Sequence, residues 1–287
     1  MNDLAMFTSD WHIGVHDPRA LTTIFEVVSD LQPRVIVLGG DILDCAELHK
    51  TRFGSPAPVT ELSLVQEIEI TKRLFSDLRK RAPDAEIVYL EGNHEARLLR
   101  QAERAAPRLV KFLPSWRDLL GLDALGIKWF PYRYPYFLDE VVMVHGTKST
   151  MNAAKLEMQK WHRPYIQGHS HREKIYQAMS PGGVEIWGIE AGHAREAQGV
   201  EWTPDPTPDW QQGFVLLRRA HHEWAPFLAR ITGKGGTESC AVALPHALIT
   251  TDRRDRDRLW RPIREALKAD ILAEYEALID HRRNGRV

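Results

Sequence analysis

Side chains that can bind metal ions come directly after five short apolar runs of this sequence. They are Asp10 and His12 after the first run, Asp41 and Asp44 after the second, Asn93, His94 and Glu95 after the third, His145 after the fourth, and His169 and His171 after the fifth. Carboxylate, imidazole and amide oxygen ligands suit manganese, iron, zinc or cobalt better than calcium, whose sites contain only oxygen. The sequence therefore predicts a transition-metal centre.

The number of ligands indicates two ions rather than one. A single catalytic ion with an open position needs three protein ligands. Two ions roughly 3.5–4 Å apart need more ligands, share a bridging carboxylate, and suit in-line attack at phosphorus. The candidate ligands number seven: Asp10, His12, Asp41, Asn93, His145, His169 and His171.

The first three apolar runs, residues 4–7, 35–38 and 87–90, are rich in β-branched and aromatic side chains and end at turn signals, as buried strands do. Apolar stripes at helical spacing lie between them, over residues 21–31 and 62–78. Alternating strands and helices predict a parallel sheet covered by helices. The carboxyl ends of its strands meet at one edge, so we expect the distant ligands to lie together there.

Beyond about residue 128 the pattern changes to shorter pieces typical of strands, with few helices between them. We expect a second, mostly antiparallel sheet from these pieces: residues 136–138, 141–144, 165–167, 184–188 and 213–217.

The chain is divided here into a core over residues 1–195, a loop and strands over 196–250 that complete or cap it, and a C-terminal helix over 251–287. Residues 202–210 contain three prolines and are predicted to form an exposed loop at the rim. The helical pattern after Pro262 predicts an amphipathic helix. Docking on the core and pairing with a second copy to form a homodimer both stay open for it.

Composition sets further limits. The chain has 287 residues, 43% of them hydrophobic, which is enough for a large core. Its net charge of -1 provides no global basic field for nucleic acid, and two cysteines are too few for a disulfide framework. Because the sequence shows no basic region followed by a long apolar run, neither a leader peptide nor a bilayer-spanning stretch is expected. A soluble cytoplasmic protein without a membrane partner is expected.

In order, the motifs resemble those of the calcineurin-like metallophosphoesterases over roughly residues 4–190. The matching pieces are Asp10-Trp11-His12, Gly40-Asp41-Ile42-Leu43-Asp44, Gly92-Asn93-His94-Glu95, His145-Gly146 and Gly168-His169-Ser170-His171. Together with the two predicted sheets, the resemblance implies an αββα sandwich of the α/β class, with the metal site at strand carboxyl ends and a C-terminal amphipathic helix.

The resemblance also implies roles for individual residues. The first metal would take Asp10, His12, Asp41 and His171, and the second would take Asp41, Asn93, His145 and His169. Manganese is the expected ion, with iron, zinc, cobalt and nickel as alternatives. A hydroxide bridging the metals would be the nucleophile, His94 would protonate the leaving oxygen or stabilise charge at phosphorus, and Asp44 would orient the His94 ring.

One departure from the family pattern bears on the substrate. Many phosphomonoesterases of this family have a phosphate-clamping arginine where this chain has Cys45. A phosphodiester carries less charge and needs that clamp less, so we predict phosphodiester hydrolysis, with DNA or RNA as candidate substrates of a nuclease. Phosphomonoester hydrolysis of a nucleotide, metabolite or phosphoprotein is the alternative, and a non-catalytic binding module is less favoured because all seven ligands are present.

Two segments near the motifs permit two interpretations each. Basic side chains at positions 97, 100, 104, 108 and 111 would share one helix face, either following a nucleic-acid backbone or simply facing solvent, although Pro107 interrupts the helix. The aromatic-rich residues 129–137 favour strand packing over stacking on bases.

Overall fold

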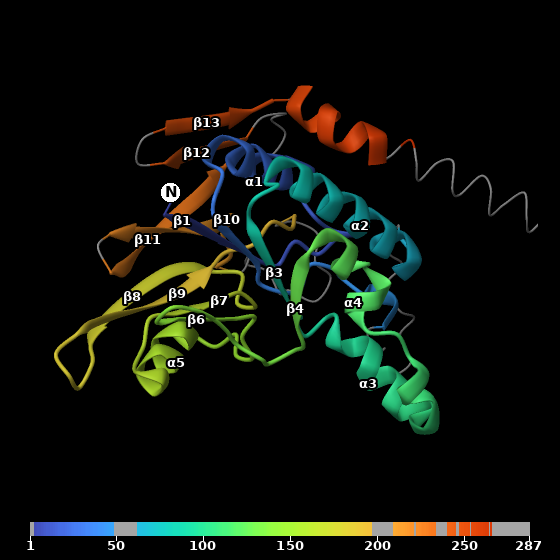
Figure 1. The fold of residues 1–287 in the computed structure, drawn as a ribbon, viewed down its shortest axis with the longest axis horizontal. Coiled ribbons are helices and arrows are strands. Elements are labelled where there is room, and N and C mark those ends of the chain that lie inside the picture. The colour runs from blue at the N-terminus through green and yellow to red at the C-terminus, as the bar shows by residue number, and fades with distance from the viewer. Residues whose placement is uncertain are drawn as a thin grey trace, which may run out of the picture.

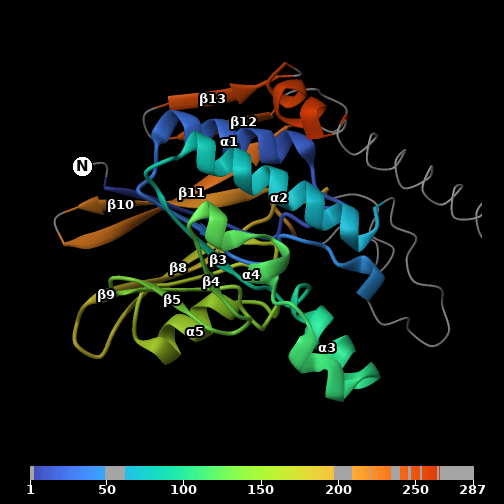
Figure 2. The same ribbon diagram turned by 45° about the vertical axis from the view of Figure 1, so that its right-hand side comes forward.

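Two β-sheets lie face to face with helices on both outer sides in the computed structural model (Figures 1 and 2), which describes residues 3–48, 62–196, 209–220, 222–233, 240–244, 247–252, 254–263 and 265. The larger sheet has the order β13 (Ala247–Thr251), β12 (Cys240–Leu244), β11 (Glu223–Thr232), β10 (Gly213–Ala220), β1 (Leu4–Thr8), β2 (Val35–Leu38), β3 (Glu86–Leu90) and β4 (Ile127–Phe130). The predicted αββα sandwich is confirmed.

Strands β1 to β4 are parallel, as the first three apolar runs predict. Their side chains alternate between two cores: Met6 packs beneath the helices, whereas Phe7 packs between the sheets. Helices α1 (Pro18–Leu31) and α2 (Leu64–Arg81) cover the outer face. Asp17 caps α1, and a capping box between Ser63 and Gln66 begins α2, so local sequence fixes where both helices start.

Strand β10 corrects the prediction for residues 213–217, which lie in the larger sheet and not in the smaller one. β10 pairs antiparallel with β1, with Val215 opposite Phe7. Phe214 packs in the core beneath the helices and Val215 in the core between the sheets. A strand with both faces buried requires a central position in the sandwich, and the place beside β1 provides it.

The smaller sheet has the order β5 (Tyr136–Leu138), β6 (Val141–Val144), β7 (Tyr165–Gln167), β9 (Glu185–Ala191) and β8 (Glu173–Met179). The prediction that this sheet is mostly antiparallel is wrong, because β6, β7 and β9 are parallel to one another. Helix α5 (Ala153–Trp161) connects β6 to β7 and returns the chain to the same end of the sheet. Its buried Met158 packs on the outer face of the sheet.

Short helices follow the second and third motifs. They are η1 (Ala46–Leu48), α3 (Ala96–Ala105), η2 (Pro107–Phe112), α4 (Trp116–Leu119) and η3 (Leu122–Leu125). Helix α3 ends at Ala105, two residues before Pro107, because proline cannot continue the hydrogen-bond ladder. In both views α3 extends away from the two sheets.

Residues 254–263 are helical and pack against α1. Trp260 Nε1 donates to the carbonyl of Pro18 at 3.0 Å and lies 3.2 Å from Thr22 Oγ1. The helix starts at residue 254, inside the predicted range 251–287 and before the amphipathic pattern that follows Pro262, because the Asp252 carboxylate accepts from the backbone N–H of Arg254 and so caps it. The predicted continuation beyond residue 265 and the loop residues 202–208 lie outside the described residues. None of the helices among the described residues is long and apolar enough to cross a membrane.

Candidate metal centre

The seven predicted ligands converge where the strands of both sheets end. Asp10 and His12 follow β1, Asp41 follows β2, Asn93 follows β3, His145 follows β6, and His169 and His171 follow β7. Parallel strands from two stacked sheets thus deliver side chains to one edge of the sandwich.

Asp10, His12 and His171 form the first group of ligands. The Nε2 atoms of the two histidines are 3.1 Å apart, and His171 Nε2 lies 3.2 Å from Asp10 Oδ1. All three side chains are buried, and their candidate ligand atoms lie within 4.8 Å of one another. Two imidazoles and a carboxylate that converge at such distances match the donors of a divalent transition-metal site.

Asp41, Asn93, His145 and His169 form the second group. His145 Nε2 is 3.3 Å from Asp41 Oδ2 and 3.0 Å from Asn93 Oδ1. Ligand atoms of Asp41, His145 and His169 lie within 4.8 Å of one another. The backbone carbonyl of Asp41 also accepts from the N–H of His12 at 3.0 Å, which ties the second group to the first.

Hydrogen bonds from outside these groups orient two of the imidazoles. His145 Nδ1 lies 2.9 Å from the carbonyl of Gly39, and His12 Nδ1 lies 2.8 Å from Asp44 Oδ1. Each bond places the ring proton on Nδ1 and leaves Nε2 facing the other ligands, as in histidine ligands of metalloproteins. The donor set therefore fits divalent metal ions.

Burial and nearby charge shift the pKa values of the candidate ligands in different directions. Burial lowers the pKa of His12 to about 3 and that of His169 to about 4. Burial also acts to lower the pKa of His145, but the charge of Asp41 and its hydrogen bond to His145, together with the charges of Asp10 and Glu95, outweigh burial and raise that pKa to about 9. A divalent ion must displace the proton of His145 when it binds.

His94 lies beside the ligands without belonging to either group. Its Nδ1 is 2.6 Å from the carbonyl of Asp44 and 3.4 Å from Asp44 Oδ1, while its Nε2 is 3.7 Å from Asp41 Oδ2. The Asp44 carboxylate lies closer to His12 than to His94, so Asp44 contacts both rings and holds His94 mainly through its backbone. Burial acts to lower the pKa of His94, but the charge of Asp41 and the bond to Asp44 raise it overall.

Five of the seven ligands adopt left-handed backbone conformations: Asp10, His12, Asp41, His169 and His171, with φ between 48° and 66°. Such conformations cost on the order of 1 kcal/mol or more for residues other than glycine and cluster at functional sites. The packing of the two sheets must hold these turns in place.

Gly168 leaves room for Asp10, and its replacement by alanine is expected to disturb the first group of ligands. A Cβ atom there would lie 2.4 Å from both Asp10 Oδ2 and Ser9 Oγ. We expect Gly168→Ala to bind about one metal ion fewer per chain, measured by inductively coupled plasma mass spectrometry. Gly182→Ala is the matched control, because a Cβ atom at Gly182 meets nothing within 4 Å. Equal metal content in both variants would contradict this expectation.

Glu95 belongs to the third motif, but the sequence predicted no role of its own for it. It is fully buried and accepts five hydrogen bonds, from the backbone N–H groups of Asp41, Ile42, Leu43 and Gly92 and from the hydroxyl of Tyr89. One carboxylate thus holds together the turns that carry Asp41 and Asn93. Its position directly after His94 is the only signal, and nothing in the sequence distinguishes this role from that of a ligand.

Arg195 and Trp210 also lie at the centre, although Arg195 was not predicted as a site residue and Trp210 was predicted only as the end of the exposed rim loop 202–210. The Trp210 ring is 4.5 Å from the His171 ring, and the Arg195 guanidinium lies 5.4 Å from the Trp210 ring centroid. Arg195 is only 4% exposed; burial lowers its pKa, while the charges of Asp44, Asp10 and Asp41 oppose that shift. Arg195 precedes and Trp210 follows the three prolines of this part of the sequence, and no motif marks either residue.

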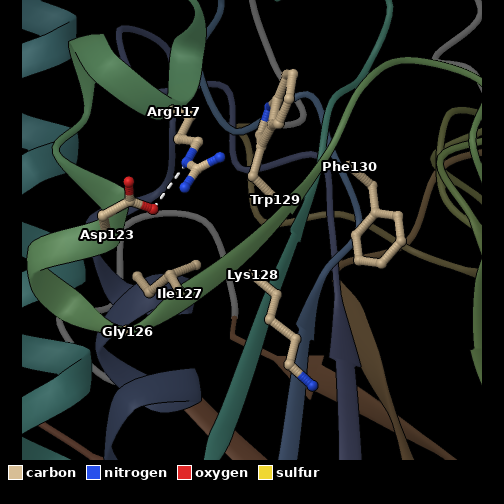
Figure 3. Close-up of a pocket in the computed structure, with 7 residues that line it drawn as sticks. All are labelled: Arg117, Asp123, Gly126, Ile127, Lys128, Trp129 and Phe130. Atoms are coloured by element: carbon tan, nitrogen blue, oxygen red, sulfur yellow. Dashed lines mark hydrogen bonds and ion pairs between the residues drawn. The ribbon is translucent and has the colours of Figure 1, made fainter.

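A pocket beside β4 lies apart from these ligands (Figure 3). An ion pair between Arg117 and Asp123 at 2.7 Å closes one side of it. The residues that line it are Arg117, Asp123, Gly126, Ile127, Lys128, Trp129 and Phe130. None of the seven candidate ligands is among them, so the chemistry lies elsewhere.

Comparison with known proteins agrees with the motif order. The model of the calcineurin-like phosphoesterase family matches residues 5–215. The Gene 54 proteins of Mycobacterium phages L5 and D29 are each 25% identical over 245 residues, covering 81% of this chain and 95% of those proteins.

Among solved structures, Vps29 of Chaetomium thermophilum is 14% identical, with a TM-score of 0.47 and coverage of 88% of this chain and 98% of that one. The phosphoesterase YfcE from E. coli is 13% identical, with a TM-score of 0.36 and coverage of 87% and 98%. The family model spans well over half of the sequence and includes all seven candidate ligands, and the chain therefore belongs to the calcineurin-like phosphoesterase family.

Proposed function

We propose that this protein hydrolyses phosphodiesters with two divalent metal ions, of which manganese is the first to test. The observation that carries this proposal is the position of Asp41: its carboxylate lies within 4.8 Å of ligand atoms of His145 and His169, and its backbone carbonyl accepts from the N–H of His12. Asp10, His12, Asp41 and His171 would hold one ion, and Asp41, Asn93, His145 and His169 the other. When bound, two such ions supply an activated water and neutralise charge on the phosphoryl oxygens.

His94 is the proton donor in this proposal. Its side chain is 14% exposed, more than those of His12 and His145, and its Nε2 lies on the side of Asp41. The bond from Nδ1 to the carbonyl of Asp44 keeps the ring in this orientation. A leaving oxygen within hydrogen-bond distance of Nε2 would receive the proton there.

The preference for a diester rests on position 45. The Cys45 side chain is fully buried, and its backbone N–H donates to Glu67 Oε2 at 2.8 Å, so this turn presents no cation to a terminal phosphate. The nearby Arg97 guanidinium donates to the carbonyl of Asp44 at 3.0 Å and supports the turn. A diester carries one negative charge, so the absence of a clamping arginine weakens its binding less than that of a doubly charged monoester.

Phosphomonoester hydrolysis is the second candidate, and Arg195 favours it. This guanidinium lies within electrostatic reach of Asp10, Asp41 and Asp44. It would replace the missing clamp if it contacted a terminal phosphate.

Metal reloading tests the proposal. We expect protein stripped with EDTA to be inactive and Mn²⁺ to restore hydrolysis of bis-para-nitrophenyl phosphate, with about two ions bound per chain. Para-nitrophenyl phosphate, assayed in parallel, should be the poorer substrate. Faster turnover of that monoester, reduced by Arg195→Ala, would favour the second candidate, and full activity without bound metal would overturn both.

A further inference from the structure

A basic and aromatic surface adjoins the metal centre on the side of the second ligand group. The Tyr132 ring lies 6.3 Å from the ring of His145. The guanidinium carbons of Arg100 and Arg133 lie 5.2 Å and 5.3 Å from the centroid of the same tyrosine ring. We propose that Arg100, Tyr132 and Arg133, here named the Tyr132 platform, bind a single strand of nucleic acid and lead it to the metal centre.

The platform is held in place by partly buried hydrogen bonds to Glu91. The backbone N–H of Tyr132 donates to Glu91 Oε2 at 3.2 Å, and Trp129 Nε1 donates to Glu91 Oε1 at 2.9 Å. Glu91 directly precedes the turn that carries Asn93, so one short segment fixes both the platform and a candidate ligand. Arg133 adopts a left-handed backbone conformation with φ of 75°, which is unusual for a non-glycine residue and is retained where the surroundings impose it.

The local charge is complementary to a polyanion, although the whole chain has a net charge of -1. Residues 96–112 contain five basic side chains and a single acidic one, Glu103. Among the described residues, none of the basic side chains at positions 100, 104, 108, 111 and 133 takes part in an ion pair. These cations extend from the platform along α3 and η2, the part of the chain that reaches away from the sheets (Figure 2).

Exposed aromatic side chains in the segments that carry these cations favour a single strand over a duplex. Tyr134 is 63% exposed and Phe112 is 72% exposed, and the Lys111 ammonium lies 4.9 Å from the Phe112 ring centroid. Tyrosine rings and guanidinium planes stack on unpaired bases, and guanidinium groups also bind phosphates. A duplex keeps its bases stacked and would use only the cations.

The assignment of a nucleic-acid strand as substrate rests on the proposed diester hydrolysis, and binding measured in EDTA separates the two. We would measure fluorescence anisotropy of a labelled 15-nucleotide DNA strand without metal, so that no cleavage occurs. The variant Arg100→Ala/Arg133→Ala should bind at least about tenfold more weakly, and its slope of log affinity against log salt should be shallower by about 1.4, or 0.7 for each lost phosphate contact. Tyr132→Ala should weaken binding about tenfold, and Tyr132→Phe should restore it.

Lys155→Ala/Lys160→Ala is the matched control, because it removes two positive charges from α5 on the smaller sheet and should leave binding unchanged. If Arg100→Ala/Arg133→Ala bound the DNA strand with wild-type affinity, the proposed role of the Tyr132 platform would be overturned. Equal binding of strand and duplex, with no effect of Tyr132→Ala, would show a general polyanion surface and overturn the assignment to a single strand. Strand binding that depends on the platform, in a protein that hydrolyses no diester, would retain this inference and reject the proposed function.

Discussion

Replacing Asp41 with asparagine is expected to lower diester turnover by about 10³-fold or more and to reduce the metal content of both sites. Asp41 is the one side chain shared by both proposed sites, and its Oδ2 lies 3.3 Å from His145 Nε2. Asparagine is among the few residues that tolerate a left-handed backbone, so the turn at φ of 48° should persist. The loss of turnover and of bound metal would then come from the missing charge and bridging oxygen. Metal analysis and kcat/KM for bis-para-nitrophenyl phosphate measure the two effects.

His94→Asn is the control for this prediction. His94 approaches the first ligand group edge-on at the His12 ring, with ring centroids 4.6 Å apart. We expect its replacement to reduce turnover by about 10²-fold or more, as for loss of a general acid, while both ions remain bound. Metal content in Asp41→Asn equal to that of the wild type would contradict the bridging role of Asp41.

The parallel half of the fold was predictable because each of its signals is local. The runs that become β1, β2 and β3 are apolar throughout, as strands buried on both faces must be, and each is followed at once by polar side chains. Sheet geometry alone then brings Asp10, Asp41 and Asn93 to one edge. His145 could be placed for the same reason, since it directly follows β6.

The smaller sheet was harder to predict because strand direction depends on contacts distant in sequence. Helix α5 makes the connection from β6 to β7 parallel, but its exposed Leu156 and Trp161 obscure a simple apolar stripe. Strand β10 has the same buried character as β1, and only the pairing of the two shows which sheet it joins. The sequence of a single strand does not determine which strand it pairs with.

The finer geometry of the centre also lay beyond the sequence. A left-handed conformation at His12 or His169 is imposed by packing, because residue type alone favours it only weakly. The contact between the Asp44 carboxylate and His12 joins two motifs that are 32 positions apart. Arg195 reaches the centre from a segment without any motif, so its charge there could not be anticipated.

Glu95→Ala is expected to destabilise the protein by about 4 kcal/mol, because five buried donors would lose their acceptor at a cost of about 1 kcal/mol or more each, offset in part by water that enters the space. Urea unfolding measured in EDTA isolates this effect from that of lost metal. Glu95→Gln should lie between alanine and wild type, since its carbonyl oxygen can still serve the three donors at Oε1 while its amide group faces the N–H groups of Asp41 and Gly92. If Glu95→Ala unfolded within about 1 kcal/mol of the wild type, the turns carrying Asp41 and Asn93 would have to be held by the sheets alone, and Glu95 would be no more than a buried neighbour of the centre.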